Sequence, residues 1–259
     1  MDKLDYLITE LINENQSLKK ITIPDDINEK KILYRALRNI REPKPISLEY
    51  LHVQDEYLKE EVNSKVIVDE KSIPSNLDII SIWQGDIITL KCDAIVNACN
   101  SYLLGCFIPN HNCIDNAIHS FAGIELREEC NNIMQGKILP NGEVILTHGY
   151  NLPSKYVIET VGPQIISQVS DKDRTELSNC YYNTLELCKK NNIKTVAFPC
   201  ISTGVYGFPK SEASIIAIKV VRKYLKDNPN IFEHIIFNVF TDEDLKIYQN
   251  NLLKENLDD

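Results

Sequence analysis

Cysteine and histidine side chains lie close together in one short stretch of this sequence, LLGCFIPNHNCID. Cys106, His111 and Cys113 fall within eight residues, and thiolate and imidazole are the ligands that zinc prefers. Gly105 and Pro109 can fold such a loop around one ion. A structural zinc usually has four protein ligands, whereas a catalytic zinc keeps one position open, so these three ligands predict a catalytic site. The alternative is two free cysteines beside a loop histidine.

A carboxylate and a second histidine follow directly after this loop. Asp115 and His119 are four residues apart, so they share one face if the segment is helical. They could form a metal or acid–base pair. Alternatively, His119 makes a core contact and the charge of Asp115 favours the helix N-terminus. Because Asp115 adjoins the predicted zinc loop, we interpret Asp115 as functional and His119 as a core residue.

Polar residues also follow two predicted strands. Asn97 and Asn100 end the stretch DAIVNACN, where their amides could orient a sugar hydroxyl or a catalytic water. Asparagines that merely terminate a strand are an equally good interpretation. Gly85 permits a tight turn, and Asp86 beside it can accept hydrogen bonds from an amino group. For that pair a plain turn is the alternative.

A fourth stretch, PCISTGVYGFP, joins a predicted strand to a predicted helix. It contains two hydroxyl residues and two glycines, namely Ser202, Thr203, Gly204 and Gly207. Backbone N–H groups in such a loop can converge on phosphate oxygens. It is not a Walker A loop, because no Gly-Lys-Ser/Thr follows. Tyr206 and Phe208 could cover a ribose or a base. A structural loop between strand and helix is the alternative.

These loops require a regular framework, and the pattern predicts one after residue 76. Short β-rich runs alternate with helical segments, which is typical of a largely parallel or mixed sheet covered on both faces. Ligands bind such sheets in the loops beyond the carboxyl ends of the strands. The predicted strands are residues 77–83, 94–97, 144–147, 156–161, 195–198 and 231–240, and the predicted helices are residues 114–130, 173–191, 211–227 and 242–253.

The first part of the chain has a helical pattern instead. Two apolar stripes at helical spacing predict two helices, through Leu4, Leu7, Ile8, Leu11 and Ile12 and through Ile32, Leu33, Leu37 and Ile40. Ser47 with Glu49 can open a third helix, and the polar tract 63–76 is interpreted as a linker or crossing segment. The predicted organisation is a helical extension over residues 1–75 and an α/β domain over residues 76–259.

Composition restricts the class of partner. The formal charge of −9 at pH 7 argues against a nucleic-acid binder. No apolar run approaches the roughly 18 residues of a membrane span, and the N-terminus carries acids where a signal peptide carries bases. We expect a cytoplasmic protein that binds neither nucleic acid nor membrane and whose cysteines are thiols or metal ligands. Five cysteines with apolar neighbours are expected to be buried: Cys92, Cys130, Cys180, Cys188 and Cys200.

Taken together and in this order, the motifs resemble the macrodomain family. The stretches GDI, DAIVNACN, DNAIHSFAG, YVIETVGP and FPCISTGVYGFP are similar to those of ADP-ribose-hydrolysing members, over about residues 77–248. The Cys-His-Cys loop and the helical extension resemble the zinc-containing branch of the family. The resemblance implies a three-layer α/β/α fold with a mixed, mostly parallel central sheet. Glu159 stands where relatives often have histidine, and we assign it no function.

The resemblance also implies a role for each matched position. Asp86 and Ile87 would contact adenine, with Asn238 and Phe240 flanking it, while Asn97, Asn100 and Phe208 would lie near the distal ribose. The diphosphate would be wrapped by the loop Ser202, Thr203, Gly204, Val205, Tyr206 and Gly207. Zinc would be bound by Cys106, His111 and Cys113. The catalytic residues would be Asp115, Asn97 and Asn100.

The implied activity is zinc-dependent removal of mono-ADP-ribose from modified proteins. In the expected mechanism, zinc polarises an oxygen at the reacting end of ADP-ribose, and Asp115 acts as the base or positions the nucleophile. The resemblance implies a lipoyl-carrying protein similar to glycine cleavage H protein as one modified partner. The alternatives are an ADP-ribose reader without turnover and a deacetylase of O-acetyl-ADP-ribose, which would use the same binding site.

Overall fold

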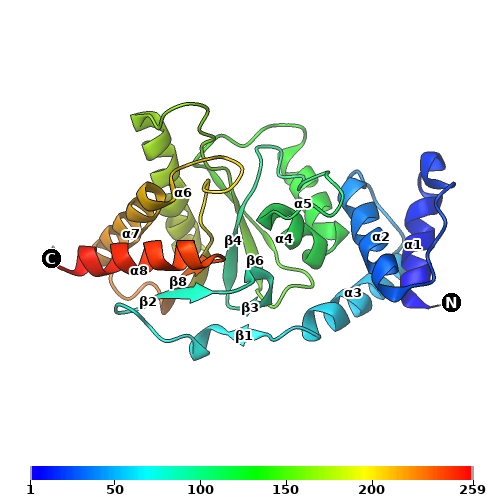
Figure 1. Cartoon of the computed structure of the whole chain (residues 1–259), viewed down its shortest axis with the longest axis horizontal. Coiled ribbons are helices and arrows are strands. Elements are labelled where there is room, and N and C mark those ends of the chain that lie inside the picture. The colour runs from blue at the N-terminus through cyan, green and yellow to red at the C-terminus, as the bar shows by residue number, and fades with distance from the viewer. Residues whose placement is uncertain (1, 258–259) are drawn as a thin grey trace.

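A six-stranded sheet forms the centre of the computed structural model, which describes residues 2–257 (Figure 1). The strand order is β2-β8-β7-β4-β6-β5, and all neighbours are parallel except β5, which runs antiparallel to β6. The prediction of a mixed, mostly parallel sheet is therefore confirmed. The strands are Ile80–Gln84 (β2), Ala94–Ala98 (β4), Val144–His148 (β5), Tyr156–Thr160 (β6), Thr195–Phe198 (β7) and His234–Val239 (β8).

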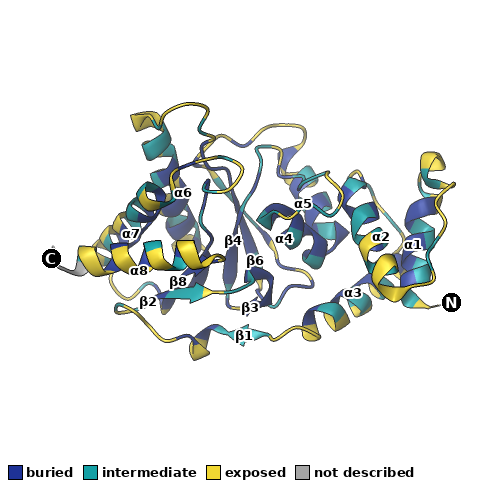
Figure 2. Cartoon of the chain, viewed as in Figure 1, coloured by how far each residue is buried: buried dark blue, intermediate teal, exposed yellow. Residues whose placement is uncertain are grey.

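Helices cover both faces of this sheet, which confirms the three-layer arrangement (Figures 1 and 2). In β4, Val96 faces one hydrophobic core and Ile95 faces the other, as the two-residue period of a strand requires. The first core is closed by Asp171–Lys190 (α6), Lys210–Asp227 (α7) and Asp242–Leu257 (α8), and the second by Ile114–Ala122 (α4) and Ile124–Met134 (α5). None of the described helices is long and apolar enough to cross a membrane.

The single helix predicted over residues 114–130 is wrong, because two helices meet at Gly123. This glycine has φ 113°, a backbone conformation that side-chain-bearing residues rarely adopt. Its N–H still donates to the carbonyl of His119, so it ends α4 and at the same time precedes α5. The apolar spacing continues through the break, and spacing alone therefore did not reveal it.

The N-terminal extension contains three helices, as predicted, and their apolar side chains form a small core together with Ile124 of α5. The helices are Lys3–Asn13 (α1), Ile27–Ile40 (α2) and Leu48–Asn63 (α3). Asp26 and Ser47 cap α2 and α3 by accepting hydrogen bonds from backbone N–H groups. The predicted α2 stripe is only partly right. Ile32 is 59% exposed, because Tyr34 and Leu37 face the core instead.

The tract 63–76 is more than the predicted linker. Val68–Asp69 (β1) pairs in parallel with Leu90–Lys91 (β3), and Glu70 is buried. The Glu70 carboxylate lies 2.6 Å from Nδ1 of His234, whose Nε2 lies 2.6 Å from the hydroxyl of Ser81. These contacts join the tract to β8 and β2. Three short 3-10 turns complete the elements, at Gln16–Leu18 (η1), Glu70–Ser72 (η2) and Ile87–Thr89 (η3).

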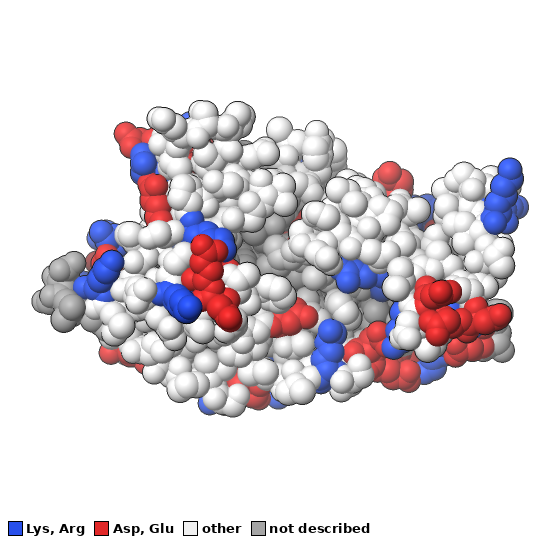
Figure 3. Space-filling view, in the orientation of Figure 1, with Lys and Arg blue, Asp and Glu red and all other residues white. Residues whose placement is uncertain are grey.

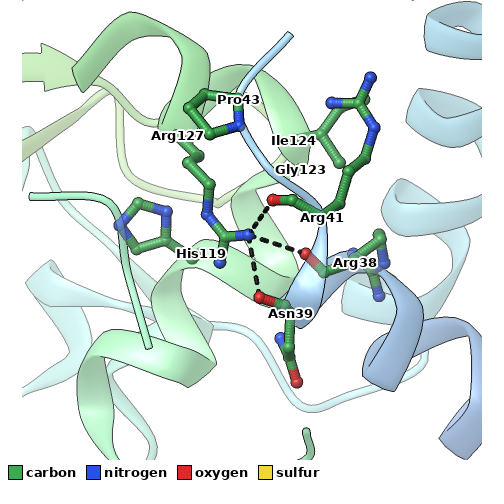
Figure 4. A pocket seen from close by; sticks show the side chains of 8 residues that line it. All are labelled: Arg38, Asn39, Arg41, Pro43, His119, Gly123, Ile124 and Arg127. Carbon is green, nitrogen blue, oxygen red and sulfur yellow. Dashed lines mark hydrogen bonds between the residues drawn. The ribbon is translucent and has the colours of Figure 1, made fainter. Parts of the chain in front are cut away.

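A buried arginine fastens the extension to the main domain. Arg127 of α5 donates from Nη1 to the backbone carbonyls of Arg38, Asn39 and Arg41 at the end of α2 (Figure 4). A cation at this position satisfies carbonyls that the helix leaves unpaired and complements the negative end of its dipole. A cavity of about 10 Å³ remains beside these groups, room for one water molecule at most.

Replacing Arg127 by methionine is therefore expected to lower the free energy of unfolding by roughly 2–4 kcal/mol, because three buried carbonyls would lose their charged donor. Urea denaturation measures the change. Lys137→Met, at an exposed lysine just beyond α5, is the matched control and is expected to change stability by less than about 0.5 kcal/mol. Equal stability of the two variants would contradict this role for Arg127.

Of the cysteines expected to be buried, Cys92, Cys130, Cys180 and Cys188 are buried and Cys200 is half-buried. None of the eight cysteines forms a disulfide in the structure.

Candidate functional site

The loops singled out in the sequence meet at one edge of the sheet. Parallel strands place their carboxyl ends together, so the segments after β2, β4, β6 and β7 lie side by side there. The start of α4 closes the same edge next to β4. Figure 3 shows this face, which is hollowed near its middle and carries few charged side chains there. The sheet therefore assembles a candidate ligand site from residues far apart in the chain.

Asp115 lies at the centre of a buried hydrogen-bond network. Nδ2 of Asn97 donates to Asp115 Oδ1 at 2.9 Å, and Nδ2 of Asn100 is 3.4 Å from the other carboxylate oxygen. Nε2 of His119 lies 3.5 Å from Oδ1. Asp115 is only 6% exposed, and Asn97 is fully buried. The two asparagines predicted at the end of β4 thus hold the carboxylate predicted at the start of α4.

Burial determines the protonation of this network. It raises the pKa of Asp115 to about 6, although the hydrogen bonds from Asn97 and Asn100 and the charge of Arg127 act in the opposite direction. A carboxyl group with such a pKa can exchange a proton near neutral pH, as a general base or acid must. Burial lowers the pKa of His119 to about 3, helped by the charge of Arg127, so His119 is neutral.

Glu159, to which the sequence analysis assigned no function, belongs to the same network. Its Oε2 accepts a hydrogen bond of 2.8 Å from Nδ2 of Asn97, the same nitrogen that donates to Asp115. Glu159 is fully buried, and burial together with the charge of Asp115 raises its pKa to about 8. The carboxyl group therefore fixes the orientation of the Asn97 amide from behind. A charged residue inside the otherwise uncharged stretch YVIETVGP was the available signal.

The loop after β7 has the free donors that an anion cradle needs. Within residues 2–257, the backbone N–H groups of Gly204, Val205 and Tyr206 have no acceptor. The loop is closed on itself by bonds from Gly207 to Gly204 and from Phe208 to Ser202. Ser202 has φ 64°, a strained conformation that this closure holds in place. The arrangement can bind the oxygens of a phosphate without any lysine.

Gly162, two residues after β6, packs closely against this loop, and this is possible because glycine has no Cβ. A Cβ added there would lie 2.0 Å from Oγ of Ser202 and 2.8 Å from Cγ2 of Ile201. Gly162→Ala is therefore expected to displace the loop and to lower the free energy of unfolding by about 1–3 kcal/mol. Urea denaturation tests this, with Gly204→Ala as the control, because a Cβ at Gly204 meets nothing within 4 Å. Comparable loss of stability in both variants would contradict the packing argument.

The three predicted metal ligands converge. The ligand atoms of Cys106, His111 and Cys113 all lie within 4.8 Å of one another, and Sγ of Cys106 is 3.5 Å from Nδ1 of His111. All three residues are half-buried, so an ion could reach them from solvent. Burial raises the pKa of the Cys113 thiol to about 11, and a bound cation would displace its proton. Two thiols and one imidazole at these distances fit a zinc ion.

A second group of possible ligands lies deeper in the protein. His119, Cys130 and Glu159 bring their ligand atoms within 4.8 Å of one another, and all three are buried. Arg127 lies close enough to His119 to help lower its pKa, and its positive charge disfavours a cation there. We therefore interpret this group as core, in agreement with the predicted core position of His119.

The predicted adenine-binding residues gather at the other side of the edge. Nδ2 of Asn238 donates to the carbonyl of Gly85 at 2.9 Å, which places the end of β8 beside Asp86. Asp86 is half-buried, Ile87 is buried, and Phe240 is 74% exposed. These positions allow the four residues to surround an adenine ring, as predicted from the resemblance.

Phe208 differs from its neighbours in the loop after β7. It is 1% exposed, and its ring packs in the core between the sheet and α7. Its side chain therefore anchors the loop, while its contact with a ribose stays a prediction. Tyr206 is half-buried and Val205 is 77% exposed.

Comparisons with known proteins agree with this geometry. A family model described as "Macro domain" matches residues 96–217. The chain is 45% identical over 251 residues to a protein-ADP-ribose hydrolase of Staphylococcus aureus, covering 95% of this chain and 94% of that protein. It is also 45% identical over 250 residues to a protein-ADP-ribose hydrolase of Treponema medium, covering 94% and 95% respectively. A solved structure of the Trypanosoma brucei macrodomain in complex with ADP-ribose is similar, with a TM-score of 0.66, 29% identity, and coverage of 83% of this chain and 94% of that one.

Proposed function

This chain belongs to the macrodomain family, and we propose that it is a zinc-dependent hydrolase that removes mono-ADP-ribose from modified proteins. The names of relatives that are 45% identical over most of their length support the hydrolase activity. The observation that carries the proposal is the buried carboxyl group of Asp115, held by Asn97 and Asn100 near the ligand edge of the sheet.

Binding would use both ends of that edge. The unpaired N–H groups of Gly204, Val205 and Tyr206 bind the diphosphate, and Asp86 accepts a hydrogen bond from the adenine amino group. These contacts fix the ligand at a distance from the bond that breaks. Binding energy gained there holds the distal ribose in a reactive position, which supplies the proximity component of catalysis.

The reaction would occur at C1″ of the distal ribose. A water molecule attacks C1″ and the bond from C1″ to the side-chain oxygen breaks through an oxocarbenium-like transition state, so that ADP-ribose keeps the water oxygen and the bonding electrons stay on the side-chain oxygen. Asp115 accepts the proton of the water, which its raised pKa permits near neutral pH, and returns it to the departing oxygen where that group is a Ser hydroxyl. Asn97 and Asn100 keep the carboxylate in one orientation, and the half-buried Asn100 offers a hydrogen-bonding group to the ribose.

Cys106, His111 and Cys113 would hold the zinc ion, as their convergence supports. When bound, zinc supplies a Lewis acid that polarises oxygen at the reacting end of the ligand. The last of these ligands, Cys113, is only two residues before Asp115, so the chain keeps the base close to the metal loop.

A hydrolysis assay with metal analysis tests the proposal. The protein is incubated with substrates carrying ADP-ribose on Asp/Glu or on Ser, and released ADP-ribose is followed over time. An ADP-ribosylated lipoyl-carrying protein is tested as a further substrate, because the sequence resemblance implies one. Time-dependent release by a zinc-loaded protein is expected. Stable binding without release would instead identify a reader, and turnover confined to O-acetyl-ADP-ribose would identify a deacetylase.

A further inference from the structure

We propose that helix α2 of the N-terminal extension is the clamp that holds the Cys-His-Cys loop in its metal-binding shape, with Arg35 and Asn39 as the positioning residues. The proposal rests on zinc binding by this loop, as proposed above. It assigns to the extension a role in metal retention. The contacts that support this role join residues more than 70 positions apart in the chain.

The loop has little regular structure to maintain its own shape. Between β4 and α4 the described backbone forms no helix or strand, and Asn110 sits at its tip with φ 54°. One backbone bond, from His111 to the carbonyl of Ile108, closes this tip at a long 3.3 Å. The metal ligands lie on both sides of this turn, Cys106 before it and His111 and Cys113 after it. They need support from outside the loop, because a flexible loop must lose conformational entropy to bind a metal.

Arg35 supplies the first support. Its guanidinium donates from Nη2 and Nε to Oδ1 of Asn116, at 2.8 and 3.2 Å, and Nη2 lies 3.4 Å from the carbonyl of His111. The positive charge is also close enough to interact with the thiol of Cys113. A fixed guanidinium therefore orients the backbone of the ligand His111 and the side chain of Asn116 beside the ligand Cys113.

Asn39, one turn further along α2, supplies the second support. Its Oδ1 accepts the N–H of Asn110 at 2.9 Å, which pins the tip of the loop. Its Nδ2 donates to Oγ of Ser120 on α4 at 3.0 Å. A single side chain thus spans from the loop to the helix that follows it.

Asn116 transmits the position of Arg35 to the ligands. Its N–H lies 3.4 Å from Sγ of Cys113, and its Nδ2 donates to the carbonyl of Ile108 at 3.1 Å and lies 3.5 Å from that of Cys106. Because Oδ1 of Asn116 accepts from Arg35, the side-chain amide cannot rotate without losing its contacts with the carbonyls of Ile108 and Cys106. Hydrogen bonds of this kind around metal ligands typically contribute 10–100-fold in metal affinity.

Further contacts fix helix α2 to the main domain. Arg38, between the two positioning residues on α2, donates to the carbonyl of Ser120 on α4, and Arg127 of α5 donates to the carbonyl of Arg38 at the end of α2. The side chains of Arg35, Arg38 and Asn39 therefore direct their polar contacts at α4 and at the loop. These contacts suit a helix that holds the loop in one position better than a helix that moves as a lid.

Zinc release from the full-length protein tests the inference. Zinc-loaded Arg35→Ala and Asn39→Ala variants are mixed with excess chelator, and both are expected to release the ion about 10–100-fold faster than the unaltered chain. Hydrogen exchange at loop amides is expected to rise in parallel, above all at Asn110. Lys31→Ala is the control, because Lys31 lies one turn before Arg35 and pairs with Glu61 of α3, away from the loop.

The conservative variant Asn39→Asp retains the acceptor for the Asn110 N–H and is expected to restore slow exchange at that amide. Zinc release and loop exchange in Arg35→Ala and Asn39→Ala equal to those of Lys31→Ala would overturn the clamp while leaving the hydrolase proposal intact. An unaltered chain that holds zinc but releases no ADP-ribose would remove the hydrolase and leave the clamp. A chain that binds no zinc would overturn both the clamp and the zinc requirement.

Discussion

Asp115→Asn is expected to reduce the rate of ADP-ribose release by about 10²–10⁴-fold, the usual contribution of a positioned general base. Asparagine has nearly the same shape, so its side-chain oxygen can still accept the hydrogen bond from Asn97 and the network can keep its geometry. What disappears is a carboxylate whose pKa of about 6 allows it to take a proton. Single-turnover release of ADP-ribose from a modified protein measures the effect.

Binding separates this chemical role from a structural one. The Kd for ADP-ribose should change by less than about tenfold in Asp115→Asn, because the phosphate contacts are made by the loop after β7. Glu159→Gln should lose less activity than Asp115→Asn, because glutamine can still accept from Asn97. If the two variants lose activity equally, or if Asp115→Asn retains full turnover, Asp115 is not the base.

The framework could be predicted because its signals are local. Thr195–Phe198 is a run of four buried residues ending at a proline, and the structure has a strand with these same bounds. The antiparallel direction of β5 was not predictable, since a short apolar strand has the same pattern in either direction. The break at Gly123 was missed for a related reason. A single glycine is tolerated inside a helical pattern, and its φ depends on contacts with α3 and α5.

The polar residues of the candidate site could be predicted one by one, but not their network. Asn97 and Asn100 were predicted from their place at the end of a strand, Asp115 from its place beside the Cys-His-Cys loop, and the structure joins the three within hydrogen-bond distance. Glu159 was assigned no function, and no local pattern connects it to its partner Asn97, 62 positions away. Pairings at that separation depend on strand order, here the adjacency of β4 and β6, which composition and periodicity do not encode.

The role of the extension illustrates the same limit. Its three helices could be predicted from apolar spacing and capping residues, whereas Arg35 and Asn39 look like ordinary polar positions of an amphipathic helix. Only the packing of α2 against α4 brings them to the Cys-His-Cys loop. A helix that appears in the sequence as an appendage therefore contributes directly to the geometry of the site.

Removal of the metal ligands is the second change with a large expected effect. Cys106→Ser and Cys113→Ser are each expected to lose the bound zinc and to lower ADP-ribose release by at least about 100-fold, since a Lewis acid contributes several kcal/mol to such a reaction. Serine is nearly isosteric with cysteine, but its hydroxyl is a poor zinc ligand. Zinc content by elemental analysis and release of ADP-ribose are measured on the same preparations.

Cys92→Ser is the matched control for these variants. Cys92 is buried near the amino end of β4, far along the strand from the metal loop, and its Sγ donates to the carbonyl of Ala94 at 3.2 Å, a bond that serine can replace. This variant should keep zinc and turnover. ADP-ribose affinity should persist in all three, because the diphosphate contacts do not involve the thiols. Full turnover by a Cys106→Ser protein verified to be free of zinc would leave Asp115 and the asparagines as the whole catalytic apparatus, and the Cys-His-Cys loop would then serve the fold alone.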